Sequence, residues 1–438
     1  MKILGSLLLL LAAYGAAHAA ENSAAPSSAE VLFTVNNLWI MIGAALVFIM
    51  HIGFALLESG LSRAKNCVNI LCKNTVTPAI GLLTFALIGF GLMFPHGHWL
   101  PGGVLGFDQL GLQCPPGAAG MINWADGHYT YWSDFLFQGM FAATCVTIVS
   151  GAVAGRIKLS AYILFAIFYS ALVYPVVGSW GWGGGWLSKF NFHDLAGSTF
   201  VHSVGGWGAL AGVIMLGPRI GKFVNGISYP IVGHNIPLAV IGTFLLWFGW
   251  FGFNGASAFS ADPASVSYIL VATSLAASAG LMTSLCTSWI IQKKPDLTMV
   301  LNGCLAGLVA ITAGADCLSL KVAVFIGAVA GVLVVLAVMF FDRIRLDDPV
   351  GALSVHLVNG IFGTLCVGIF SVQYSFLVQL LGVVAIGSTS FLAALAIFAI
   401  IKVMIKGLRP SEDEEIRGMD LAEHGMEGYG GFQIFQNQ

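Results

Sequence analysis

Two histidines with matching neighbours lie deep inside apolar stretches of this 438-residue chain. His202 occurs in the segment VHSVGG and His356 in the segment VHLVNG, so both segments read V-H-x-V-x-G. An ionisable side chain within an apolar segment of membrane length is energetically expensive and is by default a functional candidate. One such histidine could equally be a neutral core residue bonded to a backbone carbonyl. Two in matching segments favour a role in holding or passing protons.

Carboxylate residues precede both histidines in the sequence. Asp194 lies eight residues before His202, roughly 12 Å along a helix. Such an acid is commonly a cap that the helix dipole stabilises. Alternatively, it orients a cation site without touching the cation, and a cap can do both by fixing the loop that carries the site. Asp347-Asp348-Pro349 predicts a turn with caps before the other histidine. His51, a third histidine in an apolar stretch, has no repeat partner, and we expect it to be structural.

Aromatic rings and one hydroxyl could bind a cation. Trp182 is followed by three glycines that would leave its ring unobstructed, and Phe253 and Ser257 lie on adjacent helical turns. An aromatic face binds a partly desolvated cation with about 2 kcal/mol, and a hydroxyl can accept a hydrogen bond from a cation that carries N–H groups. For several of the tryptophans the alternative is an interfacial aromatic belt. The aromatic residues expected near the outer helix ends are Phe137, Phe141, Trp180, Trp182, Trp186, Trp250, Phe251 and Phe253.

Several function classes lack support. His96-Gly97-His98 has no third ligand nearby and predicts a plain loop, so we expect no metal site. The chain has no phosphate-binding loop, no TVGYG filter and no C-x-x-C pair. No nucleophile–base pair and no basic run are visible, so the sequence predicts neither an enzyme, nor a cofactor, nor a nucleic-acid partner. A disulfide between Cys114 and Cys317, both in expected outer loops, is left open.

The composition requires lipid around the chain. Hydrophobic residues make up 58% and charged residues only 9%, whereas soluble domains carry about 25% charged residues. Lipid-exposed backbone must be helical unless a barrel closes, and about 20 apolar residues cross the membrane as a helix. The expected spans are 36–58, 70–94, 132–154, 160–181, 197–217, 234–254, 265–291, 298–315, 320–341, 351–371 and 378–405. The prediction is an all-α integral membrane protein with eleven transmembrane helices.

The start of the chain indicates a secretory signal. Residues 1–19 combine Lys2, an apolar run and an A-x-A cleavage site, the alternative being a retained helix. Residues 20–405 then form the membrane domain and 406–438 a cytoplasmic tail. Fifteen of the 18 Lys and Arg residues fall on the inside in this arrangement, and only Lys189 and Lys321 outside. The positive-inside rule therefore supports a plasma (inner) membrane protein with an outer N-terminus and an inner C-terminus.

A second match indicates an internal repeat. Ile42-Gly43 and Gly53-Phe54 in the first span have the spacing of Ile241-Gly242 and Gly252-Phe253 in the sixth. The two V-H-x-V-x-G segments fall in the fifth and tenth spans. The halves thus correspond as spans one to five and six to ten. Five is odd, so the second half is inverted in the membrane, with sites expected near the midplane.

Five stretches together resemble the ammonium transporter / methylammonium permease / Rh superfamily, in its bacterial ammonium transporter branch. The resemblance runs from the first span to the tail. The stretches are 194–206 (DLAGSTFVHSVGG), 137–142 (FQGMFA), 182–185 (WGGG), 249–254 (GWFGFN) and 347–356 (DDPVGALSVH). It implies an outer cation-recruitment site at Trp182, Ser257, Phe137 and Phe141, and a pore gate of the stacked rings of Phe141 and Phe253.

The resemblance also implies that His202 and His356 are twin pore histidines and that Asp194 is a structural acid near the vestibule. A homotrimer is implied, and residues 418–425 resemble a regulatory tail that works with PII-type signalling proteins. Leu195 departs from the family, which usually has an aromatic residue there, so packing around Asp194 is in question.

The expected function is ammonium uptake, with methylammonium as a second candidate substrate. Moving a bare ion into a low-dielectric pore costs of order 20 kcal/mol, which allows only about one crossing per hundred seconds. Ammonium can shed a proton, so the hypothesis is deprotonation at the gate and conduction of ammonia past the histidines. Two alternatives remain: an ammonium-sensing receptor with little transport, whose output would need a separate partner, and an Rh-type gas channel, which usually lacks Trp182 and Ser257. Whether the proton crosses with ammonia is left open.

Overall fold

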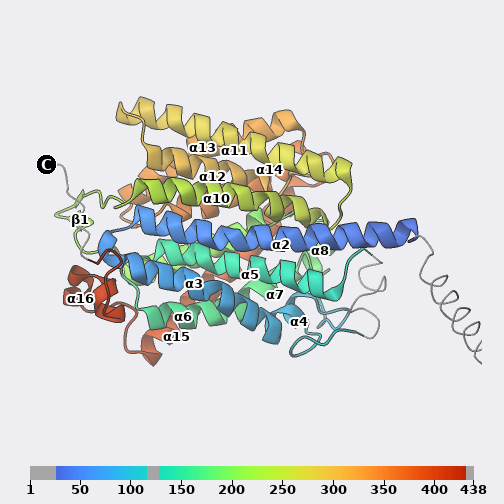
Figure 1. Ribbon diagram of the computed structural model, residues 1–438, viewed down its shortest axis with the longest axis horizontal. Coiled ribbons are helices and arrows are strands. Elements are labelled where there is room, and N and C mark those ends of the chain that lie inside the picture. The colour runs from blue at the N-terminus through green and yellow to red at the C-terminus, as the bar shows by residue number, and fades with distance from the viewer. Residues whose placement is uncertain (1–25, 116–127, 431–438) are drawn as a thin grey trace, which may run out of the picture.

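The computed structural model describes residues 26–115 and 128–430, which form a bundle of long helices running along one axis (Figure 1). The one sheet in these ranges is a hairpin of β1 (Phe223–Val224) and β2 (Ile227–Ser228). The eleven apolar helical segments of this part are α2 (Ser28–Leu61); η1, α3, η2 and α4 (Ala64–Asn66, Cys67–Thr84, Phe85–Gly89, Phe90–Met93); α5 (Tyr131–Ala152); α6, η4 and α7 (Leu159–Phe168, Tyr169–Val173, Tyr174–Ser179); η5 and α9 (Ser198–Ser203, Val204–Leu216); α10 and η6 (Ile236–Gly255, Ala256–Ala258); α11 (Pro263–Gln292); α12 (Leu297–Ile311); α13 (Leu320–Arg343); η7 and α14 (Leu353–Val358, Asn359–Phe370); and α15 (Phe376–Met404). Shorter helices are α8 (Trp186–Lys189), α16 (Glu412–Arg417) and η8 (Asp420–His424).

These eleven segments confirm the predicted spans. Ten are long and apolar enough to cross a membrane, and α12 is a shorter apolar helix between them. The main difference is that α2 begins at Ser28, earlier than expected, because Ser27 and Glu30 form a capping box. That box satisfies backbone donors of the first turn. The predicted signal, residues 1–19, lies outside the described residues.

Close packing of α2 against α10 confirms the inverted repeat (Figure 1). A Cβ added to Gly53 would lie 2.9 Å from the carbonyl oxygen of Gly242, and one added to Gly242 would lie 2.6 Å from that of Gly53. A Cβ on Gly252 would likewise lie 2.7 Å from the carbonyl oxygen of Gly43. Gly53 of the first repeat thus meets Gly242 of the second, and Gly43 meets Gly252. A pseudo-two-fold axis requires these two contacts, because it exchanges Gly43 with Gly242 and Gly53 with Gly252. Small residues permit this approach of membrane helices.

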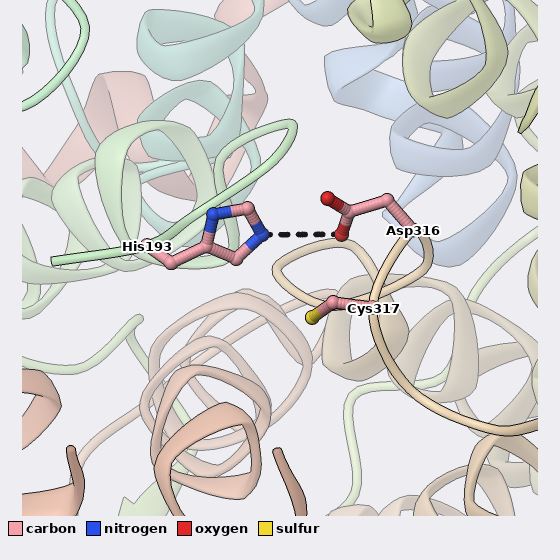
Figure 2. Close-up of side chains that lie close together, drawn as sticks. All are labelled: His193, Asp316 and Cys317. Atoms are coloured by element: carbon pink, nitrogen blue, oxygen red, sulfur yellow. Dashed lines mark hydrogen bonds and ion pairs between the residues drawn. The ribbon is translucent and has the colours of Figure 1, made fainter. Parts of the chain in front are cut away.

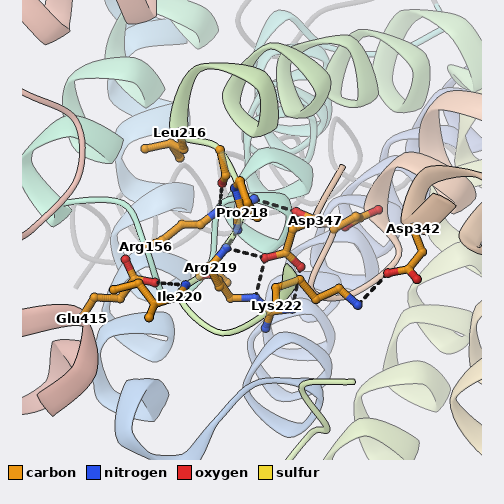
Figure 3. A network of polar contacts seen from close by, with 12 residues as sticks. Arg156, Leu216, Pro218, Arg219, Ile220, Lys222, Asp342, Asp347 and Glu415 are labelled. Carbon is orange, nitrogen blue, oxygen red and sulfur yellow. Dashed lines mark hydrogen bonds and ion pairs between the residues drawn. The ribbon is translucent and has the colours of Figure 1, made fainter. Parts of the chain in front are cut away.

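The two ends of the bundle differ. The short helices α4, α7 and α8 lie at one end, and the hairpin and α16 lie at the other, here called the tail end (Figure 1). At the tail end, Arg219 binds both carboxylate oxygens of Asp347 at 2.8 Å, and Arg156 donates to the backbone oxygen of Asp347 (Figure 3). This network ties the segment after α9 to the segment before η7, so it joins the two repeats at the tail end.

The tail packs on the segment after α9 and on the first turns of α3 and α6. Glu415 accepts from the N–H of Ile220 at 2.9 Å, as Figure 3 shows. Asp420 accepts from the N–H of Asn69 at 2.9 Å, and Glu423 accepts from that of Leu159 at 2.9 Å. The described part of the predicted 406–438 tail is therefore an ordered element bonded to the helix bundle.

Replacing Asp347 with Asn lowers the free energy of unfolding by about 2 kcal/mol at neutral pH. Burial alone would raise the pKa of Asp347, but its hydrogen bonds to Arg219 and the charges of Arg219 and Arg156 lower it to about 2 from 3.8. Because the folded pKa is depressed, this stabilisation is fully present above about pH 4 and is lost as the pH falls through about 2. Unfolding of the detergent-solubilised protein as a function of pH measures it.

The matched control is Asp342→Asn, because Asp342 pairs with Lys222 but its side chain is 40% exposed. Its loss should not exceed about 1 kcal/mol. Equal losses for the two variants would show that the buried Arg219–Asp347 pair stabilises the fold no more than an exposed pair does.

Candidate functional site

Asp194 caps the helical segment that carries His202. Its carboxylate accepts hydrogen bonds from four successive N–H groups at 2.7 to 3.0 Å, those of Gly197, Ser198, Thr199 and Phe200. Gly197 has φ of +108°, a conformation that an L-residue rarely adopts, and the segment then begins with the wide π turns of η5. Burial raises the pKa of Asp194, and the N–H groups oppose that rise. The carboxylate therefore fixes the helix start from which His202 projects.

The second repeat has an equivalent carboxylate cap, formed by Asp348. Asp348 lies eight residues before His356 and accepts from the N–H groups of Gly351, Ala352 and Leu353 at 2.7 to 3.2 Å. Gly351 has φ of +83°, and the π-helical η7 follows. The sequence indicated caps at this turn, but not that Asp348 is the counterpart of Asp194. The shared eight-residue spacing to histidine is the signal that would have identified it.

The structure brings the two histidines into direct contact. The Nδ1 atoms of His202 and His356 lie 3.2 Å apart, and the rings stack with centroids 5.2 Å apart. With two neutral rings, one Nδ1–H donates to the other Nδ1. Both rings are buried, and the Nε2 atom of His202 has no hydrogen-bond partner among the described residues. The pair can therefore share one proton and offers a free nitrogen to a small solute.

Aromatic rings continue the stack from the histidines. Phe253 lies with its ring centroid 5.3 Å from that of His202, and Phe141 stacks on Phe253 at 4.2 Å. Phe54 lies on the other side, 6.0 Å from His356. Phe54 and Phe253 follow the matched glycines of the two repeats, so the stack has the same pseudo-symmetry as the fold. The predicted gate residues thus lie next to the predicted histidines.

A cavity of about 570 Å³ opens beyond Phe141, away from the tail end, and is here called the Trp182 cavity. The Trp182 indole N–H donates to the carbonyl oxygen of Asp194 at 2.8 Å, and the Ser257 hydroxyl donates to that of Phe253 at 2.7 Å. Both donors are used, so a solute meets an aromatic face and hydroxyl lone pairs. The predicted residues on its wall are Phe137, Phe141, Trp182, Asp194, Leu195 and Ser257.

Two further cavities lie on the tail side of the histidines. His356, Phe54 and Glu58 line a small cavity of about 20 Å³, which has room for about one water-sized molecule. A tail-side cavity of about 650 Å³ shares Asn302 and Val350 with it. The order is therefore Trp182 cavity, phenylalanine rings, histidine pair, small cavity and tail-side cavity.

Some of these residues were missed or misplaced from the sequence. Trp250 is fully buried and stacks on His202 with centroids 5.0 Å apart, so an interfacial position is wrong for it. It precedes Gly252 by two residues as His51 precedes Gly53, so His51 does have a repeat counterpart. Glu58 in α2 accepts hydrogen bonds from Asn74 and Ser150 and also lines the small cavity.

The structure also shows the surroundings of Leu195, of the two outer cysteines and of His98. Leu195 leaves all four bonds of Asp194 in place, and its own N–H donates to the carbonyl oxygen of Ala313 at 3.0 Å. Cys114 and Cys317 are both free thiols, so no disulfide joins them. His98 pairs with Asp108 at 3.1 Å, as a loop residue does.

The fold and these cavities define a class: a polytopic membrane protein built as an inverted repeat, with cavities on both sides of a buried histidine pair. The chain matches the model of the Ammonium Transporter Family over residues 38–429. It belongs to that family.

Relatives agree with this assignment. Ammonium transporter Amt2 of Archaeoglobus fulgidus is 39% identical over 97% of this chain and 94% of its own. Ammonium transporter Amt2 of Haloferax mediterranei is 37% identical over 92% and 91%. Among solved structures, a chain titled "Sensor Amt Protein" is similar with a TM-score of 0.84 and 36% identity, over 90% of this chain and 99% of that one. Candida albicans Mep2 is similar with a TM-score of 0.79 and 28% identity, over 92% of each chain.

Proposed function

We propose that this chain takes up ammonium by binding the cation in the Trp182 cavity, removing a proton at the phenylalanine rings and conducting ammonia past the histidine pair. The single observation that supports it most is the order of the groups. A cation-binding surface, an apolar closure and a pair of proton acceptors follow one another along one path.

Binding rests on Trp182 and Ser257. Each donor hydrogen is used by a backbone carbonyl, so Trp182 and Ser257 can offer a cation an aromatic ring and hydroxyl lone pairs. Phe137 and Phe141 add edge-on rings, 4.7 Å apart by their centroids. Cation–π attraction of about 2 kcal/mol suits an ammonium that still keeps part of its water.

The closure selects against permanent charge. Phe141 and Phe253 stack at 4.2 Å, which leaves no room for a hydrated ion between them. A potassium ion meets the full desolvation penalty there, whereas ammonium can leave its proton behind. The proton acceptors nearest to this closure are the rings of His202 and His356.

Replacing Trp182 with Leu raises the ammonium concentration for half-maximal uptake about 30-fold, because about 2 kcal/mol of cation–π attraction is lost. Ser257→Ala should raise it less, by about tenfold at most, since one neutral hydrogen bond contributes about 1 kcal/mol. Ammonium uptake into proteoliposomes measures both.

Trp186→Leu is the control, because Trp186 is a neighbouring tryptophan that does not line the Trp182 cavity. Equal effects at Trp182 and Trp186 would contradict a specific cation site.

A second candidate is an ammonium sensor. It is supported by the similarity to the chain titled "Sensor Amt Protein". A sensor would bind ammonium with the same groups but conduct little. Proteoliposomes that bind ammonium and show no flux above empty vesicles would favour it. The Rh-type gas channel remains the less favoured alternative, since Trp182 and Ser257 are both present at the cavity wall.

We place the Trp182 cavity outside and the tail end in the cytoplasm of a plasma-membrane protein, as the Lys and Arg distribution indicates. We expect a homotrimer with one path per chain. The docked segment 411–424 is the surface on which a PII-type regulatory protein would act, since it is bonded to the segment after α9 and to the first turns of α3 and α6.

A further inference from the structure

Three metal-ligating side chains meet at the edge of the Trp182 cavity (Figure 2). His193 precedes Asp194 and lines the cavity, and Asp316 and Cys317 lie in the segment between α12 and α13. The Nε2 atom of His193 lies 3.1 Å from a carboxylate oxygen of Asp316. The ligand atoms of all three residues lie within 4.8 Å of one another.

The side chains of Gln379 and Tyr374 hold His193 in this position. Gln379 accepts from the His193 N–H at 2.9 Å and donates to the His193 carbonyl oxygen at 2.7 Å. The imidazole stacks on Tyr374, with ring centroids 4.2 Å apart and an interplanar angle of 11°. The histidine side chain is therefore oriented toward Asp316 by contacts that do not involve the two candidate ligands opposite it.

The thiol is available as a third ligand. Its recorded hydrogen bond is a weak one to the carbonyl oxygen of Gly314, at 3.8 Å. Figure 2 shows the sulfur of Cys317 near the gap between the imidazole of His193 and the carboxylate of Asp316. Burial and the neighbouring Asp316 raise the pKa of this thiol, so a bound metal would have to displace its proton.

The donor set selects the metal. One imidazole nitrogen, one carboxylate oxygen and one thiolate sulfur suit Zn²⁺, whereas Ca²⁺ and Mg²⁺ require oxygen ligands. Zinc–ligand bonds of about 2.0 to 2.3 Å place neighbouring ligand atoms about 3 to 4 Å apart. The His193–Asp316 separation already meets this, and the thiol, within 4.8 Å of the other two ligand atoms, has to approach them by at most about 2 Å. The side chains of His193 and Asp316 are 18% and 29% exposed, so water can enter as a fourth ligand.

We propose that His193, Asp316 and Cys317 form a Zn²⁺ site at the edge of the Trp182 cavity. The sequence did not predict it, because His193 and Asp316 are 123 positions apart. Bound zinc would fix His193 against the segment after α12. Asp194, the next residue, caps the His202 segment and accepts the Trp182 indole N–H. Zinc in the medium should therefore slow uptake, a consequence that rests on the proposed function.

Binding is tested on purified protein in lipid nanodiscs, without reference to transport. We expect one Zn²⁺ per chain by calorimetry, and with Co²⁺ an ultraviolet thiolate-to-metal charge-transfer band. His193→Ala, Asp316→Asn and Cys317→Ser should each weaken zinc binding by at least about 100-fold, and Cys317→Ser should abolish the band. His193→Ala keeps both Gln379 bonds, which involve only backbone atoms of residue 193.

Matched controls are available in the loop before α5. His98→Ala removes a histidine that pairs with Asp108 at the same 3.1 Å but has no thiol in its group. Cys114→Ser removes another partly buried free thiol. Both variants should bind zinc like the unaltered protein. The proposal is overturned if the unaltered protein binds no zinc, or if the control substitutions weaken binding as much as the site substitutions.

Uptake with and without Zn²⁺ is measured separately. Slower uptake that is relieved by Cys317→Ser supports the coupling through His193. Zinc binding with unchanged uptake would overturn only this coupling and leave the site in place. Absence of uptake without zinc would count against the proposed function and not against the site.

Discussion

Replacing both His202 and His356 with alanine lowers the ammonium-evoked current of proteoliposomes by at least about 100-fold, the range expected for loss of proton transfer by a positioned group. The physical reason is that the rings supply the nearest proton acceptors to the Phe141–Phe253 closure. Without them a proton released by ammonium has no basic group to receive it in an apolar path. The single replacements should each have a large effect, because one ring's Nδ1 serves the other at 3.2 Å.

His51→Ala is the matched control for this experiment. His51 is also buried within a helix, yet its ring contact among the described residues is with Phe48 and not with the histidine pair or the Phe141–Phe253 closure. Its removal should leave the current within about twofold of the unaltered protein, since no step uses it. Undiminished and still selective currents in the His202/His356 double variant would remove the pair from the mechanism.

Asp194→Asn should abolish uptake and lower the free energy of unfolding by about 3 to 5 kcal/mol. Four backbone N–H groups share the two carboxylate oxygens, two on each. An asparagine amide can accept on one side only and turns an NH₂ group toward the other two donors. Each buried donor left without a partner costs about 1 to 3 kcal/mol. Thermal unfolding and uptake of the same preparation give both quantities.

Asp262→Asn separates this effect from ordinary helix capping. Asp262 accepts from the N–H of Ser265 at the exposed start of α11. An asparagine oxygen can still accept this single bond, so the replacement should cost less than about 1 kcal/mol and leave uptake unchanged. If Asp194→Asn behaved like Asp262→Asn, the carboxylate would be a simple cap with no part in positioning His202.

Helix number and the repeat could be predicted because they depend on patterns spread over many residues. Eleven apolar stretches and the matched glycines of the first and sixth spans require no knowledge of side-chain contacts. The glycine pairs in particular proved to be the contact between α2 and α10, since only Gly allows the backbones to approach so closely.

The rest depended on contacts between distant segments. Trp250 resembled a belt residue from its neighbours alone, whereas its place beside His202 follows from the crossing of two separate spans. Asp348 resembled a local cap, and its equivalence to Asp194 became plain only when both π-helical starts were seen. The His193–Asp316–Cys317 group combines two loops, and no local spacing rule detects such a set.

The most direct test of the central claim compares potassium and ammonium on the same vesicles. Flux and current are recorded together across proteoliposomes that carry the unaltered protein. The apolar closure at Phe141 and Phe253 predicts ammonium uptake and no potassium current, because potassium cannot give up a proton before it enters. Potassium currents as large as those of ammonium would contradict the account.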